Sequence, residues 1–360
     1  MAVVDSIAKI QADISNGGWA ASGEVFNDAD RLDFYQQVKL WYRLYAGGWE
    51  AATRPAFAGH LTPDPWQKLV QGSNAPWSAL NAQDVLKQGE VQGIFYKSVS
   101  SSPANRHQII NMKYAHIIYE LISGHCNLMH KNERTTYDST LWSGSFTSRA
   151  YNEGFLRLNL DITNSSAVSS YELKQGGFCQ RLKDIAEIDF YLLFVDKYNK
   201  LHFIPHPMFA GGTLPTAALT ITDGLLLEPL TIERRNEFVG QVKLQGTTPQ
   251  GLQIRGKYPS NPTAGPIIQK KGYLATSNSL MTTIATRMYK YYNRDVTVTA
   301  VLPGAVGLLL ELMDRVASTY SSSGDGISWS SKKFWIQKIE VAFKPDFTAV
   351  TTLTLDAENA

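Results

Sequence analysis

The apolar positions of this chain are most regularly spaced between residues 173 and 207. After a glycine pair, Phe178, Leu182 and Ile185 occur at i, i+4 and i+7, a spacing that places three side chains on one face of an α-helix. Charged residues fill most of the positions between them. The pattern therefore predicts a short amphipathic helix with one buried face.

The apolar run 188–195 follows directly and predicts a buried strand, because it is rich in aromatic and branched residues and too short to cross a membrane. The sequence Asp196-Lys197-Tyr198-Asn199 predicts a turn, and Leu201 and Phe203 then alternate with polar residues in a returning strand. Two prolines end this strand, since proline cannot donate to a sheet ladder. The order expected for residues 173–207 is helix, strand, turn and strand.

Short apolar runs, several of them alternating with polar residues, predict further strands on both sides of this unit. The expected strands before it are residues 6–15, 22–26, 37–45, 56–61, 90–99 and 155–162. Those after it are residues 217–221, 236–246, 252–258, 296–302 and 308–319, and a hairpin of residues 334–343 with 347–355.

A period near 3.6 predicts two more helices. Residues 106–123 have one apolar face, with Gly124 in the usual stop position; this face holds Ile110, Tyr114, Ile117, Ile118 and Leu121. Residues 277–292 have another, made of Leu280, Ile284, Met288 and Tyr291 behind a Ser277 or Asn278 cap. The proline-bearing stretches 63–87 and 259–272 are expected to be connections.

These elements predict an α+β protein that is mostly β, with a barrel-like antiparallel β segment at each end and a helix and hairpin region between them. The expected domains are 1–103, 104–225 and 226–360, the last with the helix 277–292 inserted. A chain of 360 residues is long enough for two or three such domains, each with its own core.

Composition narrows the function classes. Hydrophobic residues make up 44% and charged residues 18%, as in a globular protein poor in charge. The net charge of only +2 argues against a general or specific nucleic-acid binder, which needs a basic stripe. The first residues resemble no secretory signal, and the apolar runs are shorter than the roughly 18 residues of a membrane helix. Only Cys126 and Cys179 are present, which favours assembly in a reducing cytoplasm.

Candidate metal ligands are sparse. His125 and Cys126 lie near His130, but zinc sites usually bring a second ligand pair at a regular spacing, and none is near. His202 and His206 are four residues apart on a predicted strand, where they do not share a helix face. We therefore predict no metal and no cofactor.

Catalytic motifs are equally weak. Ser145 stands in the context WSGSF, which is not a nucleophile elbow, and the glycines form neither a dinucleotide-binding nor a Walker loop. Paired carboxylates need no local motif, and several acidic residues lie in the central unit: Asp184, Glu187, Asp189 and Asp196. Tryptophans in loop-like segments could stack on sugars or fill subunit contacts: Trp66, Trp77 and Trp142. A carbohydrate-active cell-wall hydrolase is thus an alternative; the first expectation is no enzyme and no catalytic residue.

The order of the predicted elements along the chain resembles that of a known protein family. The strand Phe57-Ala58-Gly59-His60-Leu61 is similar to the F-x-G-x-hydrophobic strand of phage tail hub proteins. The helix at 108–121 follows, then the helix and hairpin in which Asp196 and Asn199 flank the turn, then the Asn236-Glu237-Phe238-Val239 entry to a final β region ending in the hairpin 334–355. Together these resemble the baseplate or tail-tip hub family of tailed phages and contractile injection machines, which includes late-control-protein-D-like proteins. The family's Gly-Asp-x-Val motif has only the counterpart Met313-Asp314-Arg315-Val316, which lacks the glycine.

The resemblance implies a fold with two tail-tube-type barrels and a structural role in the virion, at the tail tip or baseplate. It implies a homotrimer whose two barrels per chain match a six-fold tube to a three-fold spike. The implied partners are the tail tube or distal tail protein on one side and the central spike or fibre on the other, with the tape-measure protein as a further candidate. A hexameric distal tail ring protein is the second alternative.

Overall fold

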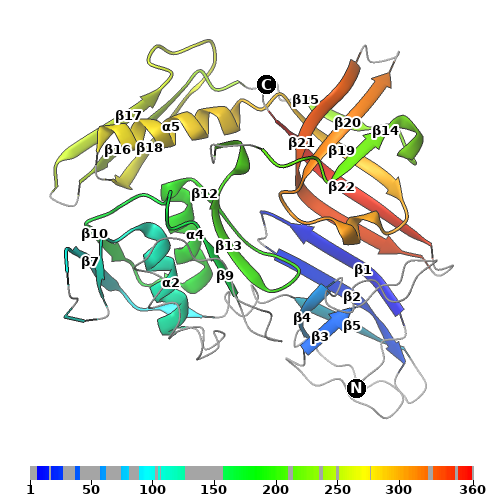
Figure 1. The fold of residues 1–360 in the computed structure, drawn as a ribbon, viewed down its shortest axis with the longest axis horizontal. Coiled ribbons are helices and arrows are strands. Elements are labelled where there is room, and N and C mark those ends of the chain that lie inside the picture. Colours follow the sequence, from blue (N-terminus) through cyan, green and yellow to red (C-terminus); the bar gives the residue numbers. More distant parts are fainter. Residues whose placement is uncertain are drawn as a thin grey trace.

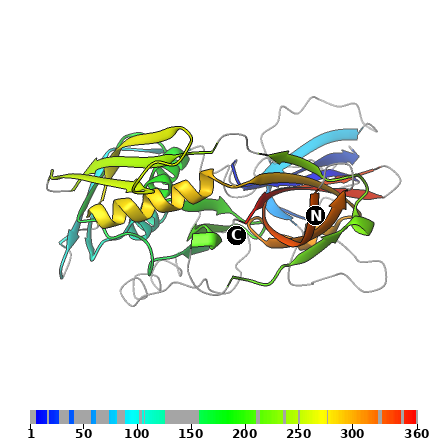
Figure 2. The same cartoon turned by 90° about the horizontal axis from the view of Figure 1, so that it is seen from above.

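A computed structural model of the chain describes residues 6–15, 18–26, 37–40, 57–61, 74–80, 89–101, 104–105, 107–125, 157–209, 214–234, 238–248, 251–275, 277–322, 327–344 and 348–358. Strands predominate, and three packed regions are visible in Figures 1 and 2. The α+β, mostly-β class expected from the sequence is confirmed. Within the described residues, no helix combines the length and apolarity needed to cross a membrane.

The first region, here called the large sheet, contains eleven strands from both ends of the chain. They are β1 (Ser6–Asp13), β2 (Gly18–Phe26), β3 (Gln37–Leu40), β4 (Phe57–Leu61), β5 (Asn74–Leu80), β14 (Leu219–Thr222), β15 (Thr231–Arg234), β19 (Val296–Pro303), β20 (Arg315–Ser322), β21 (Ile327–Phe343) and β22 (Ala349–Ala357). The short 3₁₀ helices η2 (Asp223–Leu225) and η3 (Val306–Leu309) belong to its connections.

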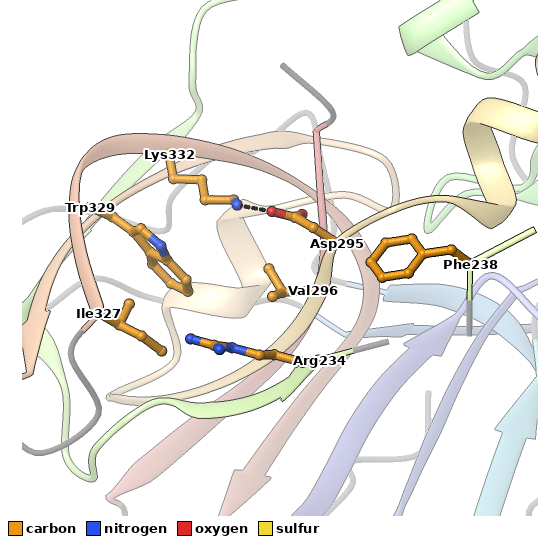
Figure 3. Close-up of a pocket in the computed structure, with 7 residues that line it drawn as sticks. All are labelled: Arg234, Phe238, Asp295, Val296, Ile327, Trp329 and Lys332. Atoms are coloured by element: carbon orange, nitrogen blue, oxygen red, sulfur yellow. Dashed lines mark hydrogen bonds and ion pairs between the residues drawn. The ribbon is translucent and has the colours of Figure 1, made fainter. Parts of the chain in front are cut away.

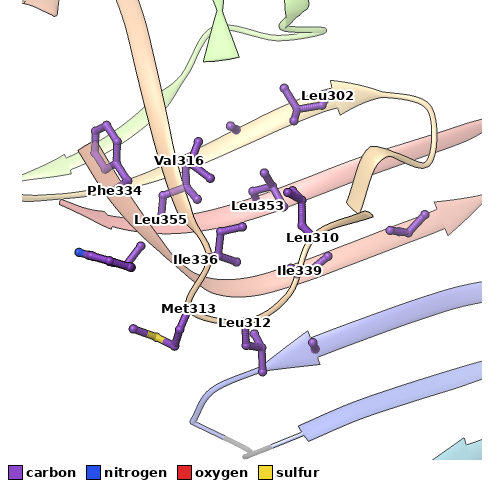
Figure 4. Packing of buried hydrophobic residues seen from close by; sticks show 14 of the residues in the cluster. Leu302, Leu310, Leu312, Met313, Val316, Phe334, Ile336, Ile339, Leu353 and Leu355 are labelled. Carbon is purple, nitrogen blue, oxygen red and sulfur yellow. The ribbon is translucent and has the colours of Figure 1, made fainter. Parts of the chain in front are cut away.

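The two ends of the chain meet where β1 pairs antiparallel with both β2 and β21. The predicted hairpin is confirmed as β21 with β22, and β22 in turn pairs with β19. Strict alternation along β19 buries Val296, Val298, Ala300 and Leu302 in the core that Figure 4 shows. The expected pair of barrels stays a prediction; the strand pairing adds that the two terminal β segments are continuous.

In the part of the middle region that the structure describes, two helices pack against three small sheets. Its elements are β6 (Glu90–Val91), β7 (Ile94–Val99), β8 (Gln108–Ile110), α2 (Tyr114–His125), β9 (Arg157–Leu160), β10 (Ser170–Leu173), β11 (Gly176–Gly177), α4 (Phe178–Asp189), β12 (Tyr191–Val195), β13 (Lys200–Pro205) and η1 (Pro207–Phe209). The predicted helix face is confirmed: Phe178, Leu182 and Ile185 are all buried.

The third region, here called the β16–α5 unit, lies between β15 and β19 in the sequence. It contains β16 (Gln241–Thr247), β17 (Gln253–Tyr258), β18 (Ile267–Leu274) and α5 (Asn278–Tyr292). The predicted cap is confirmed, since the Ser277 side chain accepts from Leu280 N. The helix packs so closely on β17 that a Cβ at Gly256 would lie 2.2 Å from the Met281 backbone. Only glycine fits there.

Several element boundaries differ from the sequence expectation. The strand predicted at 188–195 begins at Tyr191, because α4 continues to Asp189 and Phe190 ends it in the left-handed conformation (φ 53°). The helix predicted from residue 106 begins at Tyr114, since Ile110 lies in β8 and Asn111 has φ 47°. It also runs one residue past Gly124, the expected stop.

Three predicted connections or strands are also corrected. The stretch 63–87 contains β5, which pairs with β2 and β4, and the stretch 259–272 contains most of β18. The strand predicted at 308–319 is a 3₁₀ turn followed by β20, which extends to Ser322. For β5 and β18, pairing with a strand distant in the sequence decides the conformation, and the local residue pattern carries no signal of that pairing.

The domain boundaries at 103 and 225 stay predictions. The packing shows three apolar cores, one per region, and Val91 and Tyr96 belong to the core of the middle region. Residues 226–360 contribute to two of these cores, since the β16–α5 unit has its own.

The buried face of α4 gives a direct test of the middle core. Leu182 is fully buried, so Leu182→Asp removes apolar contacts and buries an unpaired charge. We expect a loss of at least about 3 kcal/mol of folding free energy, measured by denaturant unfolding. Gln180→Asp, on the exposed face of the same helix, is the matched control. Equal stability of the two variants would show that this face is not core.

Candidate functional site

The two histidines considered as ligands have structural contacts instead. His202 stacks on Phe194 with ring centroids 4.7 Å apart, and its Nε2 lies 3.0 Å from Asp196 Oδ2. His206 is buried, and this burial together with the charge of Arg294 lowers its pKa to about 3. Among the described residues, no three His, Cys, Asp or Glu side chains are grouped to hold a metal ion. His125 ends α2, while Cys126 and His130 lie outside the described residues.

The acidic residues of the central unit also hold the fold together. Asp184 pairs with Arg181 at 2.7 Å, and Glu187 pairs with Lys270 of β18. Asp189 is buried and accepts hydrogen bonds from the hydroxyls of Ser165 and Ser166. Glu187 and Asp189 therefore join α4 to other segments, whereas the Asp184 pair lies within α4 itself.

The tryptophans suggested for sugar stacking give no site. Trp66 and Trp142 lie outside the described residues. Trp77 belongs to strand β5 and not to a loop, which corrects the expectation for its backbone.

The β12–β13 turn inserts a lysine into the core of the large sheet. Lys197 is 3% exposed, and its Nζ donates to the carbonyl oxygens of Leu308 and Leu310, each at 2.9 Å. The ammonium also lies 5.6 Å from the centroid of the Trp19 ring. Buried cations need such compensation, because removing them from water is costly. This lysine therefore fixes how the hairpin sits on the sheet.

Glu311 completes this contact. Its Oε1 accepts hydrogen bonds from Trp19 Nε1 at 2.6 Å and from Leu312 N at 2.9 Å, and its Oε2 accepts from Lys197 N at 3.3 Å. The N-terminal strands, the middle region and the C-terminal part of the chain thus meet on one carboxyl group. We call Trp19, Lys197 and Glu311 the hairpin joint.

The hairpin joint contains a titratable group near neutrality. Burial raises the pKa of Glu311 to about 8, and the charge of Asp196 adds to the rise. Lys197 and the N–H groups of Leu312 and Trp19 oppose it. Between the usual pKa of a glutamate side chain and a pH of about 8, the folded chain therefore favours the protonated carboxyl of Glu311.

This shift predicts a pH dependence of stability. The folded state holds the Glu311 proton more tightly than the unfolded state does. The stability that this protonation contributes is therefore complete below the ordinary glutamate pKa and is lost as the pH rises through about 8. Glu311→Gln imitates the protonated form. Compared with this variant, the wild type should lose stability between about pH 5 and pH 9, measured by unfolding at each pH. Glu340→Gln is the control, and parallel profiles for wild type and Glu311→Gln would contradict the assignment.

A second polar contact attaches the β16–α5 unit to the large sheet. Arg294, just after α5, pairs with Asp356 of β22, and the two side chains are only 2% and 8% exposed. The guanidinium lies 3.7 Å from the Tyr291 ring centroid, while Asp356 also accepts from Thr297 at 2.8 Å. The pair, with these contacts, is here called the helix joint.

Breaking one side of the helix joint should be costly. Arg294→Met leaves the Asp356 carboxylate buried without its cation, and we expect a loss of about 3–5 kcal/mol in unfolding free energy. Adding Asp356→Leu should recover part of this loss, because the uncompensated charge is then gone. Lys9→Met, at the partly exposed pair with Glu340, is the control and should cost about 0–1 kcal/mol. Similar losses of unfolding free energy for Arg294→Met and Lys9→Met would show that the buried pair matters no more than the partly exposed one.

One pocket lies where the chain enters and leaves the β16–α5 unit (Figure 3). Its volume is about 410 Å³, and it is lined by Arg234, Phe238, Asp295, Val296, Ile327, Trp329 and Lys332. Lys332 pairs with Asp295 and lies 5.5 Å from the Trp329 ring centroid. The lining thus holds a single carboxylate, which is already paired. A glycosidase needs two carboxyl groups at a set separation, so this lining does not fit that chemistry.

Sequence reasoning missed both joints. The local pattern predicts only a turn at Lys197, and it predicts no role for Glu311 or Arg294. A local signal did exist for Glu311, which stands alone among leucines in the sequence GLLLELMD. A charge in such surroundings is expected to have a buried partner.

The three regions together have the fold of phage tail proteins. The structure matches a tail protein from Neisseria meningitidis with a TM-score of 0.60 at 12% identity, covering 97% of this chain and 91% of that chain. It matches the 43 kDa tail protein of prophage MuSo2 from Shewanella oneidensis with a TM-score of 0.54 at 10% identity, covering 97% and 93%.

A third match is a component of the Escherichia coli type VI secretion system that is itself similar to the T4 bacteriophage tail proteins gp27 and gp5. Its TM-score is 0.53 at 11% identity, covering 100% of this chain and 75% of that chain. No known protein family and no curated protein matches the sequence. These identities are low, so the similarity is one of fold, and it confirms the tail-protein fold expected from the order of elements.

Proposed function

We propose that this chain is the structural hub of a phage tail tip or baseplate. It acts as a trimeric ring adaptor between the six-fold tail tube or distal tail ring and the central spike or fibre, without catalysis of its own. The observation that carries the proposal is the fold match to tail proteins over nearly the whole chain, which includes all three regions. In this role the protein resides in the virion after assembly in the host cytoplasm.

Rigidity supports an adaptor role. The hairpin joint ties the middle region to the large sheet, and the helix joint ties the β16–α5 unit to it. A body built this way can hold two binding surfaces at a constant separation. Two similar β segments per chain would give a trimer six equivalent contacts for a six-fold tube. The tube or distal ring, the spike or fibre and the tape-measure end are the partners this role requires.

The copy number in the assembled particle tests this proposal. We expect cryo-EM of the native tail, or native mass spectrometry of the isolated tip complex, to find three copies of the chain at the axis. Six copies would favour a distal tail ring protein instead. Release of sugars from host cell-wall fractions by the purified chain, abolished by substituting one carboxylate, would favour a hydrolase and refute the non-catalytic role.

A further inference from the structure

The β16–α5 unit has an unusual charge. Between residues 238 and 294 the sequence contains no Asp or Glu, but it contains eight basic residues: Lys243, Arg255, Lys257, Lys270, Lys271, Arg287, Lys290 and Arg294. Since the whole chain carries +2, the remainder carries −6. One protein thus combines a strongly basic unit with an acidic remainder.

Part of this basic charge is used within the chain. Lys270 pairs with Glu187, Arg294 pairs with Asp356, and Arg287 donates to the Asp189 carbonyl oxygen at 3.4 Å. These three contacts attach the unit to its neighbours. These three contacts do not use the basic charges on β16 and β17.

Three of the four remaining strand charges, those on β16 and β17, share one face of the sheet, and Lys271 of β18 is the fourth. Val242, Leu244 and Ile254 point toward α5 in the core of the unit. Alternation places Lys243 and its neighbours on the opposite side, where Lys257 is its register partner and Arg255 pairs with Gln245. Arg255 and Lys257 are exposed, and no ion pair within the described residues uses any of the three cations. We call Lys243, Arg255 and Lys257 the basic face.

A complementary surface lies on the large sheet. From residue 201 to residue 233 the sequence has no Lys or Arg, and the part that runs from β14 through η2 to β15 carries Asp223, Glu228 and Glu233. All three are exposed, and none makes an ion pair within the described part of the chain. We call residues 219–233 the acidic segment.

Both surfaces carry features of an interface. Leu227 in the acidic segment is 53% exposed, and Leu252 and Ile267 beside the basic face are 68% and 46% exposed. Among the described strands, β14 pairs only with β20 and β15 only with β19, so the acidic segment connects two strands with free edges. Open strand edges are surfaces that native proteins usually cover.

Within one chain, the turn end of the acidic segment, with Asp223 and Glu228, lies far from the basic face: Figures 1 and 2 place the β16–β18 strands and the turn after β14 at opposite ends of the molecule. Glu233, at the β15 end, lies one residue before Arg234, which lines the pocket where the chain enters the β16–α5 unit. A contact between the basic face and the turn end must therefore join two copies, head to tail. Such a heterologous contact repeats from copy to copy and gives a closed ring when the rotation closes.

We infer that the basic face of one copy docks on the acidic segment of the next copy, and that this contact closes the ring. The inference rests on the proposed function, because it assumes a ring of identical chains. A second copy is favoured over nucleic acid as the occupant for two reasons. The chain itself carries the complementary acidic surface, and the basic face presents lysine, arginine and glutamine without aromatic side chains for base stacking.

Charge reversal in the full-length chain tests the contact. The basic-face variant is R255E/K257E, the acidic-segment variant is D223K/E228K at the turn end, and the third variant combines all four changes. Sedimentation velocity at about 50 mM and 500 mM salt measures self-association. We expect each double variant to weaken association by about ten-fold or more at low salt, because like charges then face each other. The combined variant should restore it.

The matched control reverses two exposed lysines of the middle region, K97E/K174E, which changes the net charge as much as R255E/K257E. It should associate like the wild type. Thermal melting of every variant separates loss of folding from loss of the contact.

Three outcomes overturn the inference. The first is a wild type that stays monomeric at low salt, and the second is a combined variant that fails to associate although it folds. The third is a set of variants that associate normally but lose retention of double-stranded DNA, which would assign the basic face to nucleic acid. The copy number in the native tail decides the proposed function separately, since a three-copy ring closed through other surfaces would refute only this inference.

Discussion

The buried ammonium of Lys197 is the constraint on which the arrangement of the regions depends. A cation 3% exposed to solvent is stable only if polar groups replace its water, and here two carbonyl oxygens and the Trp19 ring do so. Those groups come from the large sheet, while the lysine comes from the hairpin of the middle region. Sliding either region along the other would separate the charge from its partners. The Lys197 side chain therefore determines the position of the middle region relative to the large sheet.

Apolar packing alone would not set that position as firmly. Hydrophobic contacts are non-directional, and cores tolerate repacking when volume is kept. Hydrogen bonds to a buried charge require a defined distance and angle. The hairpin joint and the helix joint supply such directional contacts at the two boundaries of the large sheet. Each region has its own apolar core, and the joints specify how the cores are oriented relative to one another.

Much of the local structure could be predicted from the sequence, because helix and strand periods are local. The apolar face of α4 and the alternation of β19 follow directly from residue spacing. The pairing of β1 with β21 could not be predicted, since its partners lie more than three hundred positions apart and no turn links them. The boundary error at Phe190 has a similar origin: the strand signal of residues 188–195 includes residues that α4 retains, and a left-handed residue marks the change.

The roles of the candidate site residues could not be predicted from the local sequence either. Histidines and acidic residues could be counted in the sequence, but their roles depend on neighbours brought from distant segments. Asp196, for example, holds His202 and the amide N–H of Lys200, and so stabilises the turn that presents Lys197. The buried charged side chains of the hairpin joint and the helix joint thus lie where two regions meet and not in a cleft. Buried polar contacts tolerate little variation in distance and angle, so the hairpin joint and the helix joint fix the three regions relative to one another.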